Sequence, residues 1–193
     1  MATDTRIRVA TPDDASSVAA IYAPYVARTA VSFEEVPPTA DAMRERIARV
    51  LEQHAWLVAS TQGRVVGYGY ASAHHSRAAY RWSVDTAVYL DGAVHRRGIG
   101  RRIYDALFTL LARQRYVNAY ALITLPNAAS VRLHEAMGFT AVGIYRGVGY
   151  KFGAWHDVGS WSRSLRTPPE TPEEPLALPA LGAAEVDAIL AAR

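Results

Sequence analysis

The stretch VYLDGAVHRRGIGRR, residues 88–102, decides how this chain folds. An apolar run typical of a strand leads into a glycine-containing turn, and an amphipathic helix is predicted from about Gly98 to Gln114. Gly98 and Gly100 let the backbone approach a ligand without an intervening side chain. The first turn of a helix also presents free N–H groups and the positive end of the helix dipole. Together with the neighbouring cations Arg96, Arg97 and Arg101, these features predict a pyrophosphate site.

This turn differs from two well-known phosphate-binding loops. It lacks the Gly-Lys-Ser/Thr ending of a P-loop and the three-glycine pattern of a dinucleotide-binding fold. A glycine pair alone is also compatible with a generic helix N-terminus behind a flexible loop. The choice therefore depends on the rest of the chain.

Outward from the turn, the order of strands and helices predicts an α+β fold with a mixed sheet. Hydrophobic periodicity predicts, in chain order, a strand at 6–10, helices at 13–27 and 39–55, strands at 56–60, 65–73 and 82–90, the helix at 98–114, a strand at 119–124, a helix at 128–137, and strands at 139–146 and 158–165. Residues 167–179 hold five prolines and three glutamates, which is typical of a semi-rigid linker. A short amphipathic helix is predicted at 183–192. We therefore expect a domain over residues 1–166, followed by a proline-rich linker and helix over residues 167–193.

Length and composition are those of one globular domain. The chain has 193 residues, half of them hydrophobic, a formal net charge of +3 and no cysteine. Disulfides, thiolate metal sites and a cysteine nucleophile are thereby excluded, and the six histidines lack a metal-ligand spacing, so no metal is expected. No apolar run of roughly 18 residues and no secretory signal is found, so we expect no membrane partner and a cytoplasmic location. The scattered arginines argue against a nucleic-acid partner.

The glycine turn resembles the pyrophosphate loop of the GNAT superfamily of N-acetyltransferases, written Q/R-x-x-G-x-G/A. Here the six residues are His95-Arg96-Arg97-Gly98-Ile99-Gly100, with His95 at the usual Gln or Arg position. A second segment, Asn127 to Phe139, resembles the downstream motif in which an Asn opens a helix beside the coenzyme and a Gly-Phe pair closes it. The two motifs occur in the order found in the superfamily.

Three further segments resemble phosphinothricin N-acetyltransferases and the related methionine sulfoximine or sulfone acetyltransferases. They are Phe33–Thr39, Tyr80–Tyr89 and Gly149–Gly159, and the resemblance covers about residues 5–165. It implies a GNAT-like, mostly antiparallel sheet flanked by helices, with acetyl-CoA as the co-substrate. It also implies acetyl transfer to the α-amino group of a small amino-acid-like molecule, and a homodimer.

The resemblance assigns the chemistry to Asp85 and His134. The family has a glutamate at the Asp85 position, where a carboxylate near the thioester accepts the proton of the amine, directly or through water. His134 stands where the leaving thiolate receives a proton or a hydrogen bond. From the residues alone, Asp85 is also compatible with a solvated acid or an ion pair with Arg81, and His134 with a helix-surface histidine.

The resemblance also implies binding residues. Cofactor binding is expected at the strand end, the phosphate loop and the helix start, namely Val88, Tyr89, Leu90, His95, Arg96, Arg97, Gly98, Ile99, Gly100, Arg101 and Asn127. The backbone N–H groups of residues 88–90 are expected to stabilise the oxyanion. Substrate binding is expected at the basic residues His75, Arg77 and Lys151, which suit a carboxylate or a phosphinate, and at Phe33 and Glu35.

Two other functions fit the same fold. A protein or peptide N-terminal acetyltransferase needs an open groove, whereas the basic and aromatic residues from His74 to Trp82 favour a small anionic substrate. A non-catalytic acetyl-CoA-binding module is the other alternative, because the proline-rich tail leaves room for a partner.

Overall fold

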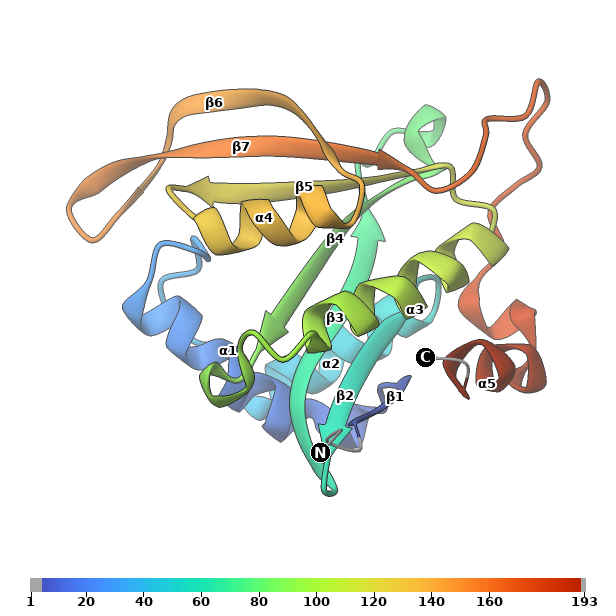
Figure 1. Cartoon of the computed structure of the whole chain (residues 1–193), viewed down its shortest axis with the longest axis horizontal. Helices are drawn as coiled ribbons and strands as arrows, with labels where there is room; N and C mark the ends of the chain where they lie inside the picture. The colour runs from blue at the N-terminus through green and yellow to red at the C-terminus, as the bar shows by residue number, and fades with distance from the viewer. Residues whose placement is uncertain (1–4, 192–193) are drawn as a thin grey trace.

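The computed structural model describes residues 5–191, which form a seven-stranded sheet with helices on both faces (Figure 1). The strands are β1 (Thr5–Val9), β2 (Trp56–Thr61), β3 (Arg64–Ala73), β4 (Ser83–Leu90), β5 (Asn118–Leu125), β6 (Thr140–Lys151) and β7 (Ala154–Ser164). Their order in the sheet is β1-β2-β3-β4-β5-β7-β6. Within residues 5–191, neighbouring strands are antiparallel except for the parallel pair β4 and β5. The predicted α+β fold with a mixed, mostly antiparallel sheet is confirmed.

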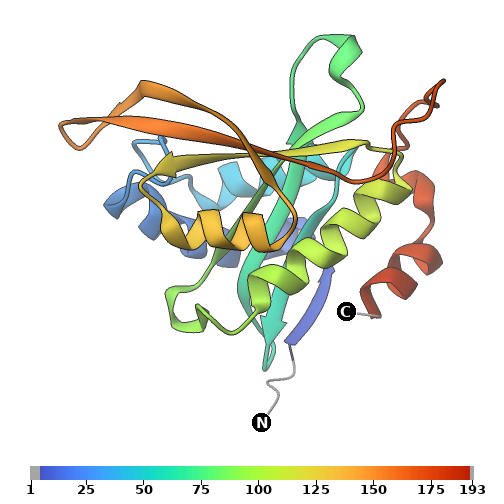
Figure 2. The same cartoon turned by 45° about the horizontal axis from the view of Figure 1, so that its top comes forward.

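The helices form two layers, and Figure 2 shows the sheet between them. They are α1 (Ala15–Arg28), α2 (Ala40–Leu51), α3 (Ile99–Arg113), α4 (Ala128–Ala136) and α5 (Ala183–Ala191). Val18 and Ile47 of α1 and α2 pack with Trp56 and Tyr68 on one face. Ile103, Leu107 and Leu111 recur at helical spacing on α3 and are fully buried on the other face. Each face of the sheet therefore has its own hydrophobic core.

The pairing of β4 with β5 is short, and this creates the central feature of the fold. The two strands pair only at Ser83↔Asn118, Val84↔Ala119 and Asp85↔Tyr120. Beyond these residues β4 stays paired with β3 as far as Leu90, and β5 stays paired with β7. The strands therefore diverge from Asp85 and Tyr120 onward, and this wedge between β4 and β5 is visible in Figure 1.

The hairpin β6–β7 is longer than predicted. Its strands reach Lys151 and start again at Ala154, and the turn uses left-handed backbone at Phe152 and Gly153 with φ of 51° and 75°. The glycines of this segment and two register shifts, at Ala141/Gly143 and Tyr145/Gly149, interrupt the alternation that identifies a strand. The sequence prediction was therefore wrong in leaving residues 147–151 and 154–157 outside strands.

The C-terminal segment packs against the rest of the domain. Leu178, Leu181, Val186 and Leu190 are buried in the same core as α3. The backbone N–H of Leu176 donates to the Gln114 carbonyl at 2.9 Å. The apolar side of the predicted helix at 183–192 thus lies on its own chain, and residue 192 falls outside the described residues. None of the helices within residues 5–191 has the length and apolarity that crossing a lipid bilayer requires.

Candidate active site

The loop before α3 has left-handed backbone at two positions. Gly98 precedes α3 with φ of 76° and ψ of 0°, a left-handed conformation that glycine adopts without strain. Arg96 is also left-handed, with φ of 63°. Within residues 5–191 the backbone N–H groups from Arg96 to Arg101 donate to no protein acceptor. The turn therefore presents a run of free donors at the positive end of α3, as an anion site requires.

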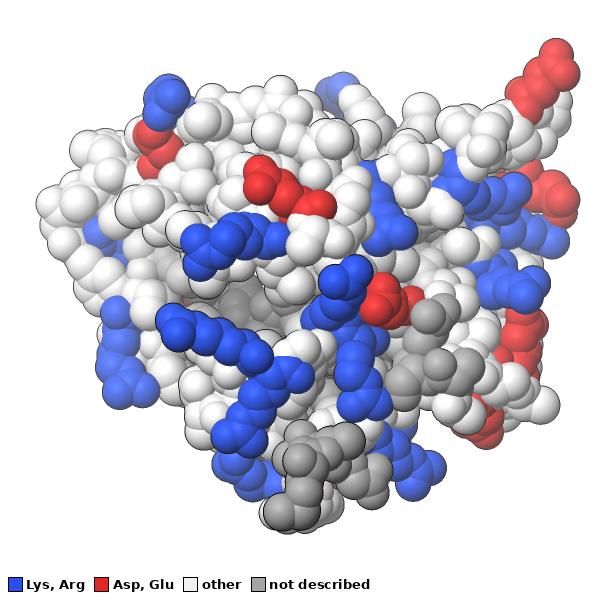
Figure 3. All heavy atoms as spheres, in the orientation of Figure 1, with Lys and Arg blue, Asp and Glu red and all other residues white. Residues whose placement is uncertain are grey.

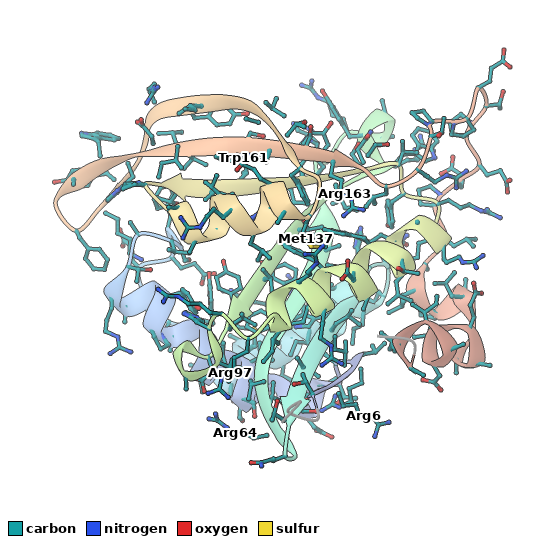
Figure 4. The ribbon with its side chains drawn as sticks, in the orientation of Figure 1. Arg6, Arg64, Arg97, Met137, Trp161 and Arg163 are labelled. Carbon is teal, nitrogen blue, oxygen red and sulfur yellow. The ribbon has the colours of Figure 1, made fainter. Side chains whose placement is uncertain are left out.

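The arginines of this loop are available to an anion. Arg96, Arg97 and Arg101 are exposed, and none of them pairs with a carboxylate in the part of the chain that the structure describes. Arg97 lies on the loop that precedes α3 (Figure 4). Figure 3 shows a hollow between this loop and α4, with Lys or Arg side chains around it. The loop therefore combines a hollow, free amides and positive charge, which suit an anion.

The remaining predicted loop residues contact other parts of the protein. Ile99 is buried in the core beneath the loop. A Cβ on Gly100 would lie 3.3 Å from Leu133 and 3.5 Å from Leu90, so this glycine lets α3 approach α4 and β4 closely. The Tyr25 hydroxyl donates to the Leu90 carbonyl at 2.7 Å, and its oxygen lies 3.2 Å from His95 Nε2. The His95 side chain thus ties the loop to α1.

The wedge between β4 and β5 holds a cavity of about 60 Å³. Its lining comes from both strands, from α3 and α4, and from the loop after α1: Val31, Thr86, Ala87, Val88, Tyr89, Tyr104, Leu122, Ile123, Thr124, Asn127, Ser130 and His134. The Asp91 N–H donates to the Val66 carbonyl at 2.9 Å, so the peptide groups of Asp91 face β3. Successive residues of β4 face β3 and the opposite side in turn. By alternation the peptide groups of Val88 and Leu90 face the wedge, whereas that of Tyr89 faces β3. Of the three predicted amide donors, two thus point into the wedge.

His134 is a buried residue with 4% exposure, so the helix-surface alternative is wrong. Its Nδ1 lies 2.8 Å from the Ser130 carbonyl, which can only accept, so Nδ1 carries the proton. The Tyr104 hydroxyl lies 2.9 Å from Nε2 and must therefore donate to it. Burial lowers the pKa of His134, which favours this neutral form. Tyr104, which the sequence analysis missed, thus belongs to the same polar group in the wedge.

Asn127 opens α4, as its motif indicated. Its side-chain oxygen accepts from the Ser130 N–H at 3.1 Å, an N-cap that satisfies one free helix donor. The cap places Ser130 and His134 on the wall of the wedge. Asn127 therefore positions this wall as well as lining it.

Asp85 stands where the wedge begins, but it is not alone. His74 Nδ1 lies 2.8 Å from Asp85 Oδ1, and the side chains are 29% and 34% exposed. Burial raises the pKa of Asp85, and the hydrogen bond with His74 opposes this rise. The predicted alternative partner, Arg81, is wrong, because Arg81 pairs with Glu174 in the tail.

Phe33 lines a larger cavity of about 420 Å³ next to the wedge. The other lining residues are Val31, Leu122, Thr124, Tyr145, Val148 and Val158. Val31, Leu122 and Thr124 also line the wedge, so the two cavities adjoin. The larger one is mostly apolar.

Glu35 is exposed, whereas its neighbour Glu34 is held in place. Arg46 donates to both Glu34 oxygens at 2.7 and 2.9 Å, and Tyr22 donates at 3.0 Å. The Arg46 pair, more than any other contact, lowers the pKa of Glu34. Glu34 therefore fixes the loop that carries Phe33, and sequence reasoning gave no signal to choose it over Glu35.

Lys151 is not a free cation at the mouth of the cavity, and its predicted substrate role is contradicted. It is 6% exposed. Its Nζ donates to the carbonyls of Val26, Ser32 and Glu34, each at 2.7 Å. All three ammonium protons are thus used to hold the loop after α1 against the β6–β7 hairpin.

His75 and Arg77 line a different cavity from Phe33, so the three predicted substrate residues do not converge. Their cavity has about 320 Å³ and lies among η2 (Ala78–Tyr80), Tyr116 and the tail residue Glu174. Adjacent side chains on extended backbone point in opposite directions. Consequently His74, and not His75, meets Asp85. Among residues 5–191 no cluster of His, Asp or Glu could hold a metal ion.

Comparisons with known proteins agree with this geometry. A family model described as an acetyltransferase (GNAT) domain matches residues 7–159. The chain is 39% identical over 171 residues to a phosphinothricin N-acetyltransferase of Streptomyces viridochromogenes, a match that covers 88% of this chain and 93% of the relative. It is 32% identical over 153 residues to an L-methionine sulfoximine/L-methionine sulfone acetyltransferase of Salmonella typhimurium, with 79% and 90% covered.

A solved structure matches the fold closely. The crystal structure of a GNAT superfamily phosphinothricin acetyltransferase from Sinorhizobium meliloti, in complex with acetyl-CoA, aligns with a TM-score of 0.82 at 30% identity. The alignment covers 89% of this chain and 96% of that one. The predicted family and GNAT-like fold are confirmed: the chain belongs to the GNAT acetyltransferase family, and among its members it is similar to phosphinothricin N-acetyltransferases.

Proposed function

We propose that the protein transfers the acetyl group of acetyl-CoA to the α-amino group of a small amino-acid-like substrate. The observation that carries this proposal is the wedge between β4 and β5, which joins a loop of free amides to an acid–base pair at its closed end. Acetyl-CoA supplies an activated acyl thioester and a diphosphate. Both need the donors that this wedge offers.

Each part of the wedge has a chemical task. The amides of residues 96–101, with Arg96 and Arg97, hold the diphosphate. The amides of Val88 and Leu90 stabilise the negative charge that develops on the acyl oxygen. Asp85, at the closed end, belongs to the group that removes the proton of the amine. Tyr104, whose hydroxyl donates to His134 Nε2, lines the wedge and relays the second nitrogen proton to the leaving thiolate.

The larger cavity favours particular substrates. Val31, Phe33, Leu122 and Val148 give it apolar walls that suit an aliphatic side chain. The relatives are named for phosphinothricin and for methionine sulfoximine and sulfone. We therefore place this chain's substrates among amino acids with an aliphatic stem and a tetrahedral sulfur or phosphorus group.

The test is a thiol-release assay with acetyl-CoA and a panel of amino acids, their sulfone, sulfoximine and phosphinate analogues, and short peptides. We expect turnover with a free amino acid of this class. Asp85→Asn is expected to lower kcat without changing the KM for acetyl-CoA, whereas Asp13→Asn, at an exposed acid on the surface, serves as the control. Turnover on peptides but not on free amino acids would favour the N-terminal acetyltransferase alternative.

A homodimer is the second part of the proposal. The β6–β7 hairpin exposes a set of large apolar side chains, namely Val142, Ile144, Tyr145, Val148, Tyr150, Phe152 and Trp155. Exposed apolar side chains gathered on one hairpin are typical of an interaction site. We expect twice the chain mass in light scattering, and a shift to the monomer for Val142→Glu but not for Gln62→Glu in the distant β2–β3 turn. A monomeric wild-type protein would contradict this part.

A further inference from the structure

The pair formed by His74 and Asp85 contains a residue that the family resemblance did not assign. The resemblance expects a glutamate at the Asp85 position, and Asp85 is one methylene shorter. In the structure the imidazole of His74 meets this shorter carboxylate at 2.8 Å. A glutamate at position 85 would place its carboxylate one methylene farther from β4. Here the imidazole ring of His74 lies beyond the shorter Asp85 carboxylate, so the ring nitrogen Nε2 is the outermost group of the pair.

The His74 ring is held firmly in one orientation. Its face stacks on Tyr120 with ring centroids 4.1 Å apart and an interplanar angle of 13°. Tyr80 meets it edge-on at 6.1 Å, and the His74 backbone N–H donates to the Ser83 carbonyl at 3.4 Å. Contacts from β4, β5 and η2 thus immobilise a side chain that sits on a loop.

The hydrogen bond also decides which ring nitrogen is basic. An ionised carboxylate can only accept, so His74 Nδ1 carries a proton and Nε2 carries the lone pair. Within residues 5–191 Nε2 has no protein partner. With the side chain 29% exposed, this lone pair is within reach of a substrate or a water molecule.

The ring lies on the substrate side of the sheet. Side chains two residues apart on a strand share a face, so Tyr120, Leu122 and Thr124 point the same way. Leu122 and Thr124 line both adjoining cavities. Tyr120, under the imidazole, is one strand repeat of ~6.6 Å from Leu122. The His74 ring therefore stands at the edge of the space where an amine would meet the thioester.

We propose that His74 Nε2 is the proton acceptor of the reaction and that Asp85 is its positioning partner. This inference rests on the proposed function and names the base within it. The substrate ammonium gives one proton to Nε2 and becomes an amine. The C–N bond then forms as the C–S bond breaks, the second nitrogen proton goes to the thiolate, and His74 returns its proton to solvent.

The surroundings of the ring support this assignment. The titratable groups packed around the pair are Asp85 from β4, Tyr80 from η2, Tyr120 from β5 and Tyr70 from β3. Asp85 is the only carboxylic acid among these groups, and its Oδ1 lies 2.8 Å from His74 Nδ1. Imidazole groups in general exchange protons near neutral pH more readily than carboxylates, which makes them better general bases there.

The test compares His74→Phe with Asp85→Asn. Phenylalanine keeps the stack on Tyr120 but cannot accept a proton. We expect kcat/KM for the amine to fall about 100-fold, the acetyl-CoA affinity measured by calorimetry to stay unchanged, and the acidic limb of the pH–rate profile to disappear. The double variant should be no slower than the slower single variant, because the two residues act as a unit. Added imidazole should partly restore His74→Ala.

The matched control is His54→Phe, because His54 also stacks on a tyrosine, Tyr116, at 5.5 Å, away from Asp85. It should retain wild-type kcat/KM. If His74→Phe kept more than half of the activity while Asp85→Asn lost it, Asp85 itself would be the base and this inference would be wrong. If the wild-type chain released no thiol with any amine, the proposed function would fail, and the inference with it.

Discussion

Replacing Lys151 by methionine separates a structural from a substrate-binding role for this residue. Methionine keeps the length of the side chain but removes three donors that each lie 2.7 Å from a carbonyl. Three charge-assisted hydrogen bonds contribute about 1.5–3 kcal/mol each, and the loss of hydration of a buried ammonium offsets several kcal/mol of that sum. We expect a net loss of about 3 kcal/mol in the free energy of unfolding. In a protein of this size that lowers Tm by roughly 6–12 °C.

The measurement is thermal unfolding followed by circular dichroism, together with steady-state kinetics. Because the loop that carries Phe33 loses its anchor, the KM for the amine should rise, whereas the KM for acetyl-CoA should not change. Arg146→Met on the same strand is the control, since Arg146 is 74% exposed and pairs only at the surface, and its Tm should match the wild type. An unchanged Tm with a severe loss of amine binding would refute the structural role of Lys151 and restore the role suggested by the sequence.

Three more predictions concern the phosphate loop, the thiolate side and the N-terminal ion pair. Gly98→Ala places a Cβ on left-handed backbone at about 1 kcal/mol of strain, so the KM for acetyl-CoA should rise roughly fivefold. Gly63→Ala in the β2–β3 turn is the control, because Gly63 has a φ of 75°. It should introduce the same strain and leave the KM for acetyl-CoA unchanged. Tyr104→Phe leaves His134 Nε2 without its donor, so kcat should fall about 100-fold at constant KM for acetyl-CoA; an unchanged kcat would remove Tyr104 from the proton path. The pKa of Asp14 is lowered: burial raises it, and this is outweighed by hydrogen bonds from Arg8 and Thr11. A lowered pKa means that the ionised acid stabilises the fold above its ordinary value of 3.8 and that this stability is lost as pH falls through the lower, folded value. The free energy of unfolding, measured in urea between pH 6 and pH 3, should therefore fall more steeply for the wild type than for Asp14→Asn. Equal slopes of this free energy against pH would contradict the assignment.

Local features of the site were predictable because they depend on residues close together in the chain. The left-handed backbone at Gly98, the start of α3 and the Asn127 cap each involve only a few neighbouring positions. Glycine tolerance of positive φ and the preference of Asn for the N-cap are properties of single residues. The phosphate loop and the fold class could therefore be inferred before any contact was known.

Contacts between distant segments were not predictable in the same way. His74 and His75 are chemically identical, and only the direction of the backbone after β3 decides which of them meets Asp85. Glu34 and Glu35 differ for the same reason. The packing of the whole sheet fixes the register of strands and loops. This register decides which of two neighbouring side chains makes the contact.

The amino-acid sequence by itself determined the glycine turn before α3, the α+β order of elements and the family, because these follow from periodicity and from short runs of residues. Only the tertiary structure decided that Lys151 is buried and holds three carbonyls, that Tyr104 meets His134 and that His74 meets Asp85. A polar side chain has the same chemistry in every sequence. Whether it binds a ligand or holds the protein together depends on its burial and on the partners that folding brings to it.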